Sequence, residues 1–562
     1  QDRTYQIASA HFYSANFDEA KKRFEEIAAD GDSPWHFVAS YMVARTLIRK
    51  ASLGAPEQNQ EPLRAAESQL KKILDDKSFA HMHATAQRLA NLVRVRLYPE
   101  TRMYELGGKL AIRIENYDLK QDLWDYTTLL DQHLQSDDKE NERFRKGDDL
   151  TDWIVTFQSP GPTSLDHALE RLQTKRPGEW RRSDAWLICA LSKIAHSHAK
   201  ASELLAQALS VKPTSAAFAS ARFHAVRLLI ESGKNDEART VLDQLLKNHR
   251  AQFDVSSLNL LTSKRMSLAT TLDEFLSYAP RVPAALSWND DGREVPADDE
   301  TVLGEMKDIK GQPRFDVDAG AALIRAIPLA VLATAAKNTS LPAPLRRDLA
   351  QAVWLRAVIL GDTKTADELV PVLSSLVPEL STLLNEFLSA TTPQAKKSIA
   401  LYAWLKFPGL EPIVDVGVGR RTPLQQQDSY RDNWWCGAAF SAPKTEVEVA
   451  DESDGPPSFT AESTQPLLFL SPAENATAAR EWKTLQTLGA APNYISQQVI
   501  QWANRSPDDP RVPEALHLAV NTTRFGCTDE QSGRWSKAAF DLLHRKYPNT
   551  PWAKKTKYWF NQ

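Results

Sequence analysis

The most unusual chemistry in the sequence lies in YRDNWWCGAAF, residues 430–440, where an arginine, two adjacent tryptophans and a cysteine occur together. Adjacent tryptophans cannot both point into one core from a regular helix or strand, because neighbouring side chains diverge in both. One can pack while the other faces a groove, and tryptophan and arginine dominate protein-binding surfaces. Arg431, Trp434 and Trp435 are therefore candidate partner-binding residues. The alternative is a structural plug between two helical arrays.

The three cysteines are Cys189, Cys436 and Cys527, and their wide separation does not match the spacing of a zinc site. Cys436 and Cys527 each follow an aromatic-rich turn and can form a disulfide if the protein is exported. Two buried thiols are the alternative, and the sequence leaves both open. A nucleophilic Cys436 is not favoured, because no histidine lies near it in the sequence. Cys189 lies in the apolar run AWLICALSKIA and is expected to be a small buried side chain.

Other residues that could support catalysis or metal binding form no recognisable motif. The sequence contains no P-loop, no GxSxG elbow and no HExxH motif. His81 and His83 are two residues apart, as are His196 and His198, which places the members of each pair on roughly opposite sides of a helix. The acidic stretch at residues 289–300 lacks the alternating ligands of an EF-hand. We expect no catalytic residue, no cofactor-binding residue and no metal ligand.

Charge and hydropathy narrow the class of partner. The formal net charge of −4 argues against a polyanion as the partner of the whole chain. Basic and aromatic residues alternate in residues 534–560, a pattern that can bind an acidic partner or single-stranded nucleic acid. A terminal helix pair with a solvated basic side explains it more simply. The most apolar run, residues 319–337, contains Arg325 and Pro328 and is expected to be a buried helix rather than a membrane span.

The elements that must position these residues are predicted by a repeated helical pattern. A small residue recurs with apolar residues four and seven positions later. The six copies are Ala20, Phe24 and Ile27; Ala66, Leu70 and Ile73; Ala201, Leu205 and Ala208; Ala238, Leu242 and Leu245; Ala366, Val370 and Leu373; and Ser536, Phe540 and Leu543.

This spacing predicts stacked helix hairpins. Offsets of four and seven place three side chains on one helix face, and the small residue lets a neighbouring helix approach closely. Gly233 and Gly361 each precede an anchor by five residues, where a left-handed glycine can end the previous helix. Proline follows three anchors at position +12, at Pro213, Pro378 and Pro548, and stops the second helix. Such hairpins must stack because none can bury its apolar face alone.

The chain at this point resembles the tetratricopeptide repeat family. The resemblance is carried by ANFDEAKKRFEEI, AKASELLAQALSVKP, SGKNDEARTVLDQLL and GDTKTADELVPVLSSLVP. The second and fourth segments match best, because anchor, spacing and terminal proline all agree. The resemblance implies an all-α fold, a right-handed superhelical α-solenoid of helix hairpins, and a role in protein–protein interaction.

The organisation expected along the chain is a set of helical arrays separated by two irregular stretches. Residues 1–280 form an N-terminal array, 281–316 an irregular acidic loop, and 317–408 a middle array. Residues 409–470 form an irregular connection with an aromatic knot and an acidic loop, and residues 471–562 form C-terminal helical repeats. Connections as long as 409–470 are either functional or disordered.

The expected function is a non-enzymatic scaffold that binds a peptide or a partner protein. We expect neither a nucleic acid partner nor a membrane-spanning segment. The ending HRKYPNTPWAKKTKYWF is similar to bacterial cell-envelope members of the family. That similarity favours an exported, periplasmic protein of a bacterium, with a cytoplasmic protein as the alternative. Other functions that stay open are a helical subunit of a cell-wall-acting enzyme, such as a lytic transglycosylase, and a purely structural assembly component. The sequence does not determine the oligomeric state.

Overall fold

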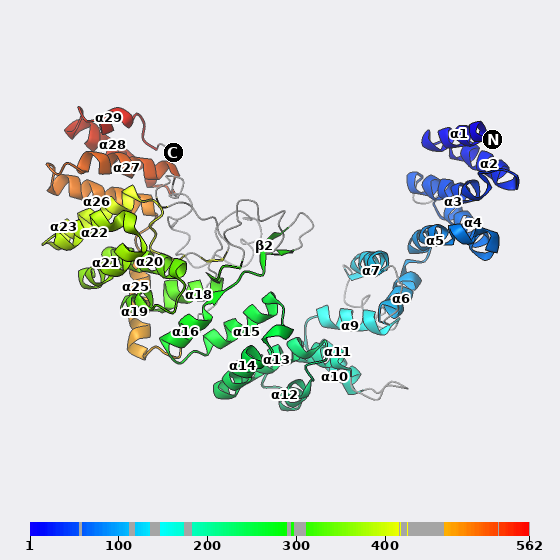
Figure 1. Cartoon of the computed structure of the whole chain (residues 1–562), viewed down its shortest axis with the longest axis horizontal. Helices are drawn as coiled ribbons and strands as arrows, with labels where there is room; N and C mark the ends of the chain where they lie inside the picture. The colour runs from blue at the N-terminus through cyan, green and yellow to red at the C-terminus, as the bar shows by residue number, and fades with distance from the viewer. Residues whose placement is uncertain are drawn as a thin grey trace. The chain divides into compact units, whose positions relative to one another are not determined.

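The computed structural model describes residues 1–55, 59–111, 119–134, 147–173, 183–288, 294–296, 311–414, 416–417, 424, 466–525 and 528–560. Helices make up 75% of this part of the chain and strands about 1%, which confirms the predicted all-α solenoid class. Figure 1 shows the chain as a succession of short helices. The handedness of the superhelix stays a prediction.

The chain divides into two compact units, Gln1–His224 and Ala225–Gln562, and the division falls within α13 (Phe218–Glu231). The predicted array boundaries stay a prediction. The helices of the first unit are α1 (Asp2–Tyr13), α2 (Phe17–Ala29), α3 (His36–Leu53), α4 (Gln60–Asp75), η2 (Lys77–Met82), α5 (His83–Leu97), α6 (Pro99–Leu110), α7 (Leu119–Leu134), α9 (Asp149–Gln158), α10 (Pro162–Gln173), α11 (Asp184–Lys193) and α12 (Ala201–Ser210).

The second unit continues the succession of hairpins. Its helices are α14 (Asn235–Asn248), η3 (Arg250–Gln252), α15 (Val255–Ser267), α16 (Leu272–Tyr278), α18 (Val317–Ala321), η5 (Ala322–Ala326), α19 (Leu329–Lys337), α20 (Ala343–Leu360), α21 (Thr363–Leu376), η6 (Pro378–Leu380), α22 (Ser381–Ser389), α23 (Pro393–Lys406), α25 (Pro472–Gln486), α26 (Ala491–Arg505), α27 (Val512–Phe525), α28 (Ser532–Lys546) and α29 (Pro551–Lys555).

Short strands interrupt the helices between α16 and α18. β1 (Pro280–Arg281) pairs antiparallel with β4 (Arg314–Phe315), and β2 (Ala285–Trp288) pairs antiparallel with β3 (Glu294–Pro296). The sequence predicted only an irregular acidic loop here. The strands differ from that prediction because each is two to four residues long, too short to show a period-two pattern of side chains.

The repeat anchors are buried as their spacing predicts. In the copies that begin at Ala20, Ala66, Ala238 and Ala366, all three side chains are at most 6% exposed. In the copies from Ala201 and Ser536 the middle side chain is only half-buried. Each helix hairpin therefore buries one stripe against its neighbours, as stacked repeats require.

Glycine ends two helices in the conformation expected from its position. Gly233 has φ +72° and Gly361 has φ +79°, both in the left-handed region. The N–H of Asp362, the residue after Gly361, donates to the carbonyl of Ala357 at 2.9 Å, which closes the last turn of α20. The chain can then reverse directly into α21.

The apolar run at residues 319–337 is buried, but it is not one helix. α18 passes into η5, a π-helical turn, and the helix breaks at Ile327 before α19 starts. The prediction of a single helix was wrong because Pro328 has no N–H for the helical ladder and its ring clashes with the preceding turn. Among the described helices, none is long and apolar enough to span a membrane.

The helices on either side of the irregular connection pack directly against each other. α23 contacts both α26 and α27. Lys406 of α23 forms an ion pair with Glu514 of α27 at 2.8 Å, and Arg511 reaches Glu386 of α22 at 3.1 Å. The stack therefore continues from α23 to α26 through these contacts, so a plug in the connection is not required to join the two sides.

The two Ser/Thr-Pro-Trp sequences near the ends of the chain differ in structure. Thr550 caps α29 by accepting the N–H of Ala553, and Pro551 occupies the first helical position. Ser33 accepts the N–H of Trp35 at 3.3 Å, so Ser33 and Pro34 form a turn before α3 rather than a cap. Trp35 then stacks on Tyr5 of α1, with ring centroids 4.4 Å apart.

Candidate functional site

The site residues proposed from the sequence lie outside the part of the chain that the structure describes. This holds for Arg431, Trp434, Trp435, Cys436 and Cys527. The aromatic patch and the disulfide therefore stay predictions. Cys189 is fully buried in α11, as its apolar surroundings predicted.

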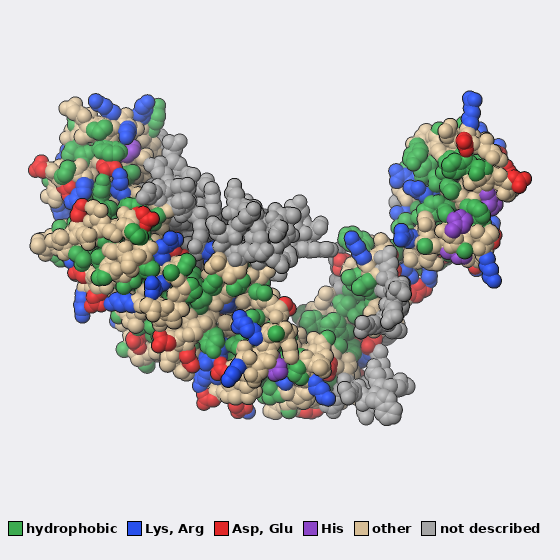
Figure 2. Space-filling view, in the orientation of Figure 1, with side chains coloured by type: hydrophobic (Ala, Val, Ile, Leu, Met, Phe, Trp, Pro, Cys, Tyr) green, Lys and Arg blue, Asp and Glu red, His purple; other side chains and the backbone are tan. Residues whose placement is uncertain are grey.

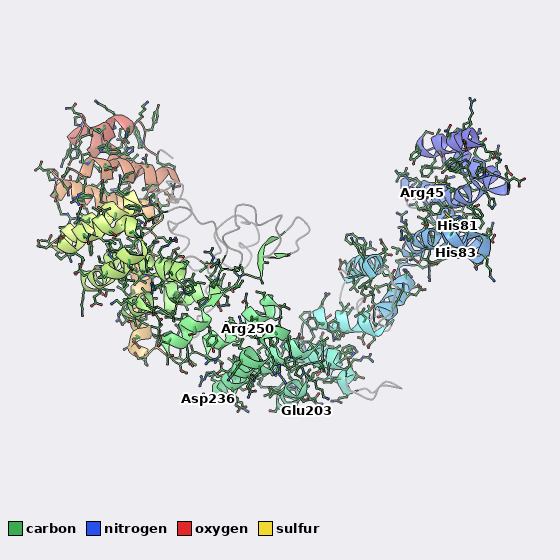
Figure 3. All side chains as sticks on the ribbon, viewed as in Figure 1. Arg45, His81, His83, Glu203, Asp236 and Arg250 are labelled. Carbon is green, nitrogen blue, oxygen red and sulfur yellow. The ribbon has the colours of Figure 1, made fainter. Side chains whose placement is uncertain are left out.

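The paired histidines near residue 81 have structural contacts. His81 lies edge-on to the ring of Phe37, with centroids 4.7 Å apart, and Nε2 of His83 lies 3.0 Å from the carbonyl oxygen of Asp76. Figure 3 labels both histidines, at the junction of η2 and α5. Within the described ranges, no group of three or more His, Cys, Asp or Glu side chains is placed to hold a metal ion.

The basic and aromatic residues near the C-terminus pack on one another. Lys555 lies over the ring of Trp552 at 4.7 Å, and Lys537 lies over the ring of Trp559 at 5.4 Å. Trp559 also contacts Phe540, with ring centroids 5.0 Å apart. These contacts fold residues 556–560 back onto α28, in agreement with a terminal helical packing unit.

Burial raises the pKa of Glu481 on α25, and a raised pKa can mark a catalytic acid. Its Oε2 accepts the N–H of Leu329 at 2.8 Å, and Leu329 is the first residue of α19. The first amides of a helix have no intrahelical acceptor and carry partial positive charge, so a carboxylate placed there stabilises the helix. The contact gives Glu481 a structural role in the fold.

The first unit contains a surface of different character on α3 and α5. Neither helix contains an aspartate or glutamate, whereas α3 carries Arg45, Arg49 and Lys50 and α5 carries three arginines. Arg45, Arg49, Arg88 and Arg96 are all exposed. We call the exposed sides of α3 and α5 with these four arginines the basic face. Figure 3 labels Arg45 on α3.

The helices of the basic face lie parallel and in register. Phe37, near the start of α3, contacts His81 of η2, two residues before α5 begins. Near the ends of α3 and α5, Nη1 of Arg96 donates to Oγ of Ser52 at 2.6 Å. Both contacts join residues whose numbers differ by 44. The register therefore holds over about 15 residues, or roughly 22 Å of helix. It places Arg88 beside Arg45 along the helices, and Arg96 one turn beyond Arg49.

The arginines of the basic face lack the counter-charges that the other helices of the unit supply. On α2 and α4, Lys21 pairs with Glu25 at 2.8 Å, and Lys71 pairs with Asp75 at 2.7 Å. No carboxylate in the described part of the unit forms an ion pair with any of the four arginines. Figure 2 shows Lys and Arg side chains along one edge of the lobe that contains α1 to α5. The exposed positive charge is therefore available to a partner.

Apolar side chains lie between the arginines. Leu92 is 37% exposed and lies one helical turn from both Arg88 and Arg96. Half-buried Tyr41 lies one turn before Arg45, and the guanidinium of Arg45 covers the ring of Phe12 at 5.9 Å. The basic face is thus a mixed surface on which charged and apolar groups alternate.

The basic face was missed at the sequence level, although a signal was present. Residues 36–53 contain arginine and lysine, and residues 83–97 contain arginine. Neither stretch contains an acidic residue, whereas residues 17–29 and 60–75 contain charges of both signs. The net charge of each predicted helix, taken separately, shows this difference.

The comparison with protein-family models matches residues 194–259 to the tetratricopeptide repeat. This segment includes α12, α13 and α14, and Figure 3 labels three of its exposed residues, Glu203, Asp236 and Arg250. It contains two of the four segments that carried the resemblance in the sequence. Neither the curated proteins nor the solved structures gave a match.

Proposed function

We propose that this tetratricopeptide-like helical repeat protein is a non-enzymatic scaffold for protein–protein interaction, and that the basic face is one of its docking surfaces. The match at residues 194–259 and the buried repeat anchors support the scaffold role. The observation that carries the docking surface is the set of exposed arginines on α3 and α5 that pair with no carboxylate in the described part of the chain. Arginine forms paired hydrogen bonds with carboxylates and is enriched at protein interfaces.

The partner is a peptide or protein, and the proposed setting is the bacterial cell envelope. The ending HRKYPNTPWAKKTKYWF supports this setting by its similarity to envelope members of the family. A subunit of a cell-wall-acting enzyme is less well supported, because the contact of Glu481 with the start of α19 accounts for that carboxylate. The aromatic stretch around Trp434 and Trp435 is proposed as a second contact site.

Affinity capture with the whole purified chain tests the proposal. The bait is compared with Arg45→Glu/Arg49→Glu and with a control, Lys22→Glu/Lys72→Glu. The control changes two exposed lysines of α2 and α4, so the change in net charge is the same. A partner identified by mass spectrometry should be lost with the arginine variant and kept with the control, and should bind again as a purified protein.

The remaining outcomes separate the two parts of the proposal. Equal capture by all three baits would show that the basic face is not the docking surface. A parallel bait with Trp434→Ala/Trp435→Ala tests the aromatic stretch in the same way. The absence of any specific partner for the unmodified chain would contradict the scaffold role.

A further inference from the structure

The basic face extends over a length that suits a short peptide segment. Its two ends are marked by the contact of Phe37 with His81 and by the hydrogen bond from Arg96 to Ser52. The distance along the helices is roughly 22 Å, which equals the length of about 15 helical residues. A partner segment of that size can contact every arginine of the basic face at once.

The chemistry of the basic face calls for two kinds of group in the segment. The four arginines of the basic face form no ion pair with a carboxylate among the described residues, so they favour negative charge in the segment, and their planar guanidinium groups fit carboxylates through paired hydrogen bonds. Leu92 and Tyr41 lie between them and gain from apolar contact. A segment in which Asp or Glu alternates with apolar side chains satisfies both requirements.

We infer that the basic face binds an acidic amphipathic segment of a partner protein that lies along α3 and α5. The inference rests on the proposed scaffold function and specifies the chemistry of its partner. Nucleic acid fits less well, because the ring of Phe12 lies under Arg45 and is not open for base stacking. The net charge of −4 also repels a long polyanion beyond the basic face.

Fluorescence anisotropy with the full chain tests this inference. The probe is a fluorescein-labelled peptide of about 16 residues. Its Leu residues recur every three or four positions, so that they share one side of a helix, and Glu residues lie beside them. Its comparison probes are the same peptide with Lys for Glu, a single-stranded oligothymidine, and vesicles containing phosphatidylglycerol. The acidic peptide should bind, and its binding should weaken as salt is raised, because exposed charges are screened.

Variants of the chain identify the site. Arg45→Gln/Arg49→Gln should weaken binding of the acidic peptide about tenfold, since two exposed charge contacts are lost. Leu92→Ser should weaken it several-fold, because the apolar contact is reduced. Lys22→Gln/Lys72→Gln should have no effect, and circular dichroism checks that each variant keeps its helical content.

Each other result overturns the inference. Tighter binding of the oligothymidine or the vesicles, lost in the same arginine variant, would assign the basic face to nucleic acid or to an anionic membrane. Equal binding of the Glu and Lys peptides would exclude charge recognition. Failure of the acidic peptide, together with loss of a captured partner in Arg45→Glu/Arg49→Glu, would reject this chemistry and leave the scaffold role intact.

Discussion

Replacement of Leu242 by alanine tests whether the chain behaves as an array of nearest-neighbour repeats. Leu242 is the middle anchor of α14 and is completely buried. Truncating a buried leucine to alanine costs about 3 kcal/mol, from the lost transfer energy and the cavity that is left. The matched control is Leu260→Ala on the adjoining helix α15, where the side chain is 52% exposed and should cost less than about 1 kcal/mol.

Hydrogen exchange followed by mass spectrometry measures the consequence locally. In a stacked array each repeat contacts only its neighbours, so the loss should be confined to the repeats around the substitution. Amides of α14 and α15 should exchange about a hundredfold faster in Leu242→Ala, because 1.4 kcal/mol corresponds to a factor of ten. Amides of α27 and α28 should not change.

Two results would refute this reasoning. An effect of Leu242→Ala no larger than that of Leu260→Ala would show that the anchor does not carry the packing of its repeat. A loss of protection shared equally by α14 and α28 would show that the second unit unfolds as one cooperative core. Either outcome would contradict the description of the chain as a repeat array.

Three further predictions concern a turn, an ionisable group and the long connection. Gly361→Ala should destabilise the second unit by about 1 kcal/mol in urea unfolding, because φ of Gly361 is +79°, which strains a residue with a side chain. The control Gly108→Ala lies in α6 with free space for a methyl group and should slightly stabilise the protein. Equal effects of the two substitutions would contradict this prediction. The hydrogen bond from the N–H of Thr270 lowers the pKa of Glu274 to about 2. Glu274 therefore contributes stability above pH 4.5 that is lost as the pH falls towards 2, and Glu274→Gln should remove this part of the acid loss; an unchanged pH profile of unfolding would refute it. Deletion of residues 425–465 should leave the melting temperature within a few degrees, because α23 packs directly on α26 and α27; loss of the folded state would show that the connection is structural.

The helices of the fold could be predicted where they depend on residues close together in the sequence. The basic face could not be predicted in this way. The spacing of Ala238, Leu242 and Leu245 places these side chains on one helical face whatever the rest of the chain does, and all three are buried. Gly361 was predicted to end a helix because glycine alone adopts a left-handed conformation without cost. The short strands between α16 and α18 were missed because two to four residues show no period.

The sequence by itself determined the helices, the faces that they bury and the points at which they end, since these depend on residues within a few positions of one another. It also determined that residues 36–53 and 83–97 carry positive charge alone. Only the tertiary structure decided that these charges form one surface. Arg45 and Arg96 are 51 residues apart and share a face because α3 and α5 stack in parallel, with the hydrogen bond from Arg96 to Ser52 between them. The ion pairs of Lys21 with Glu25 on α2 and of Lys71 with Asp75 on α4, by contrast, join residues four positions apart on one helix, so the sequence alone determines them.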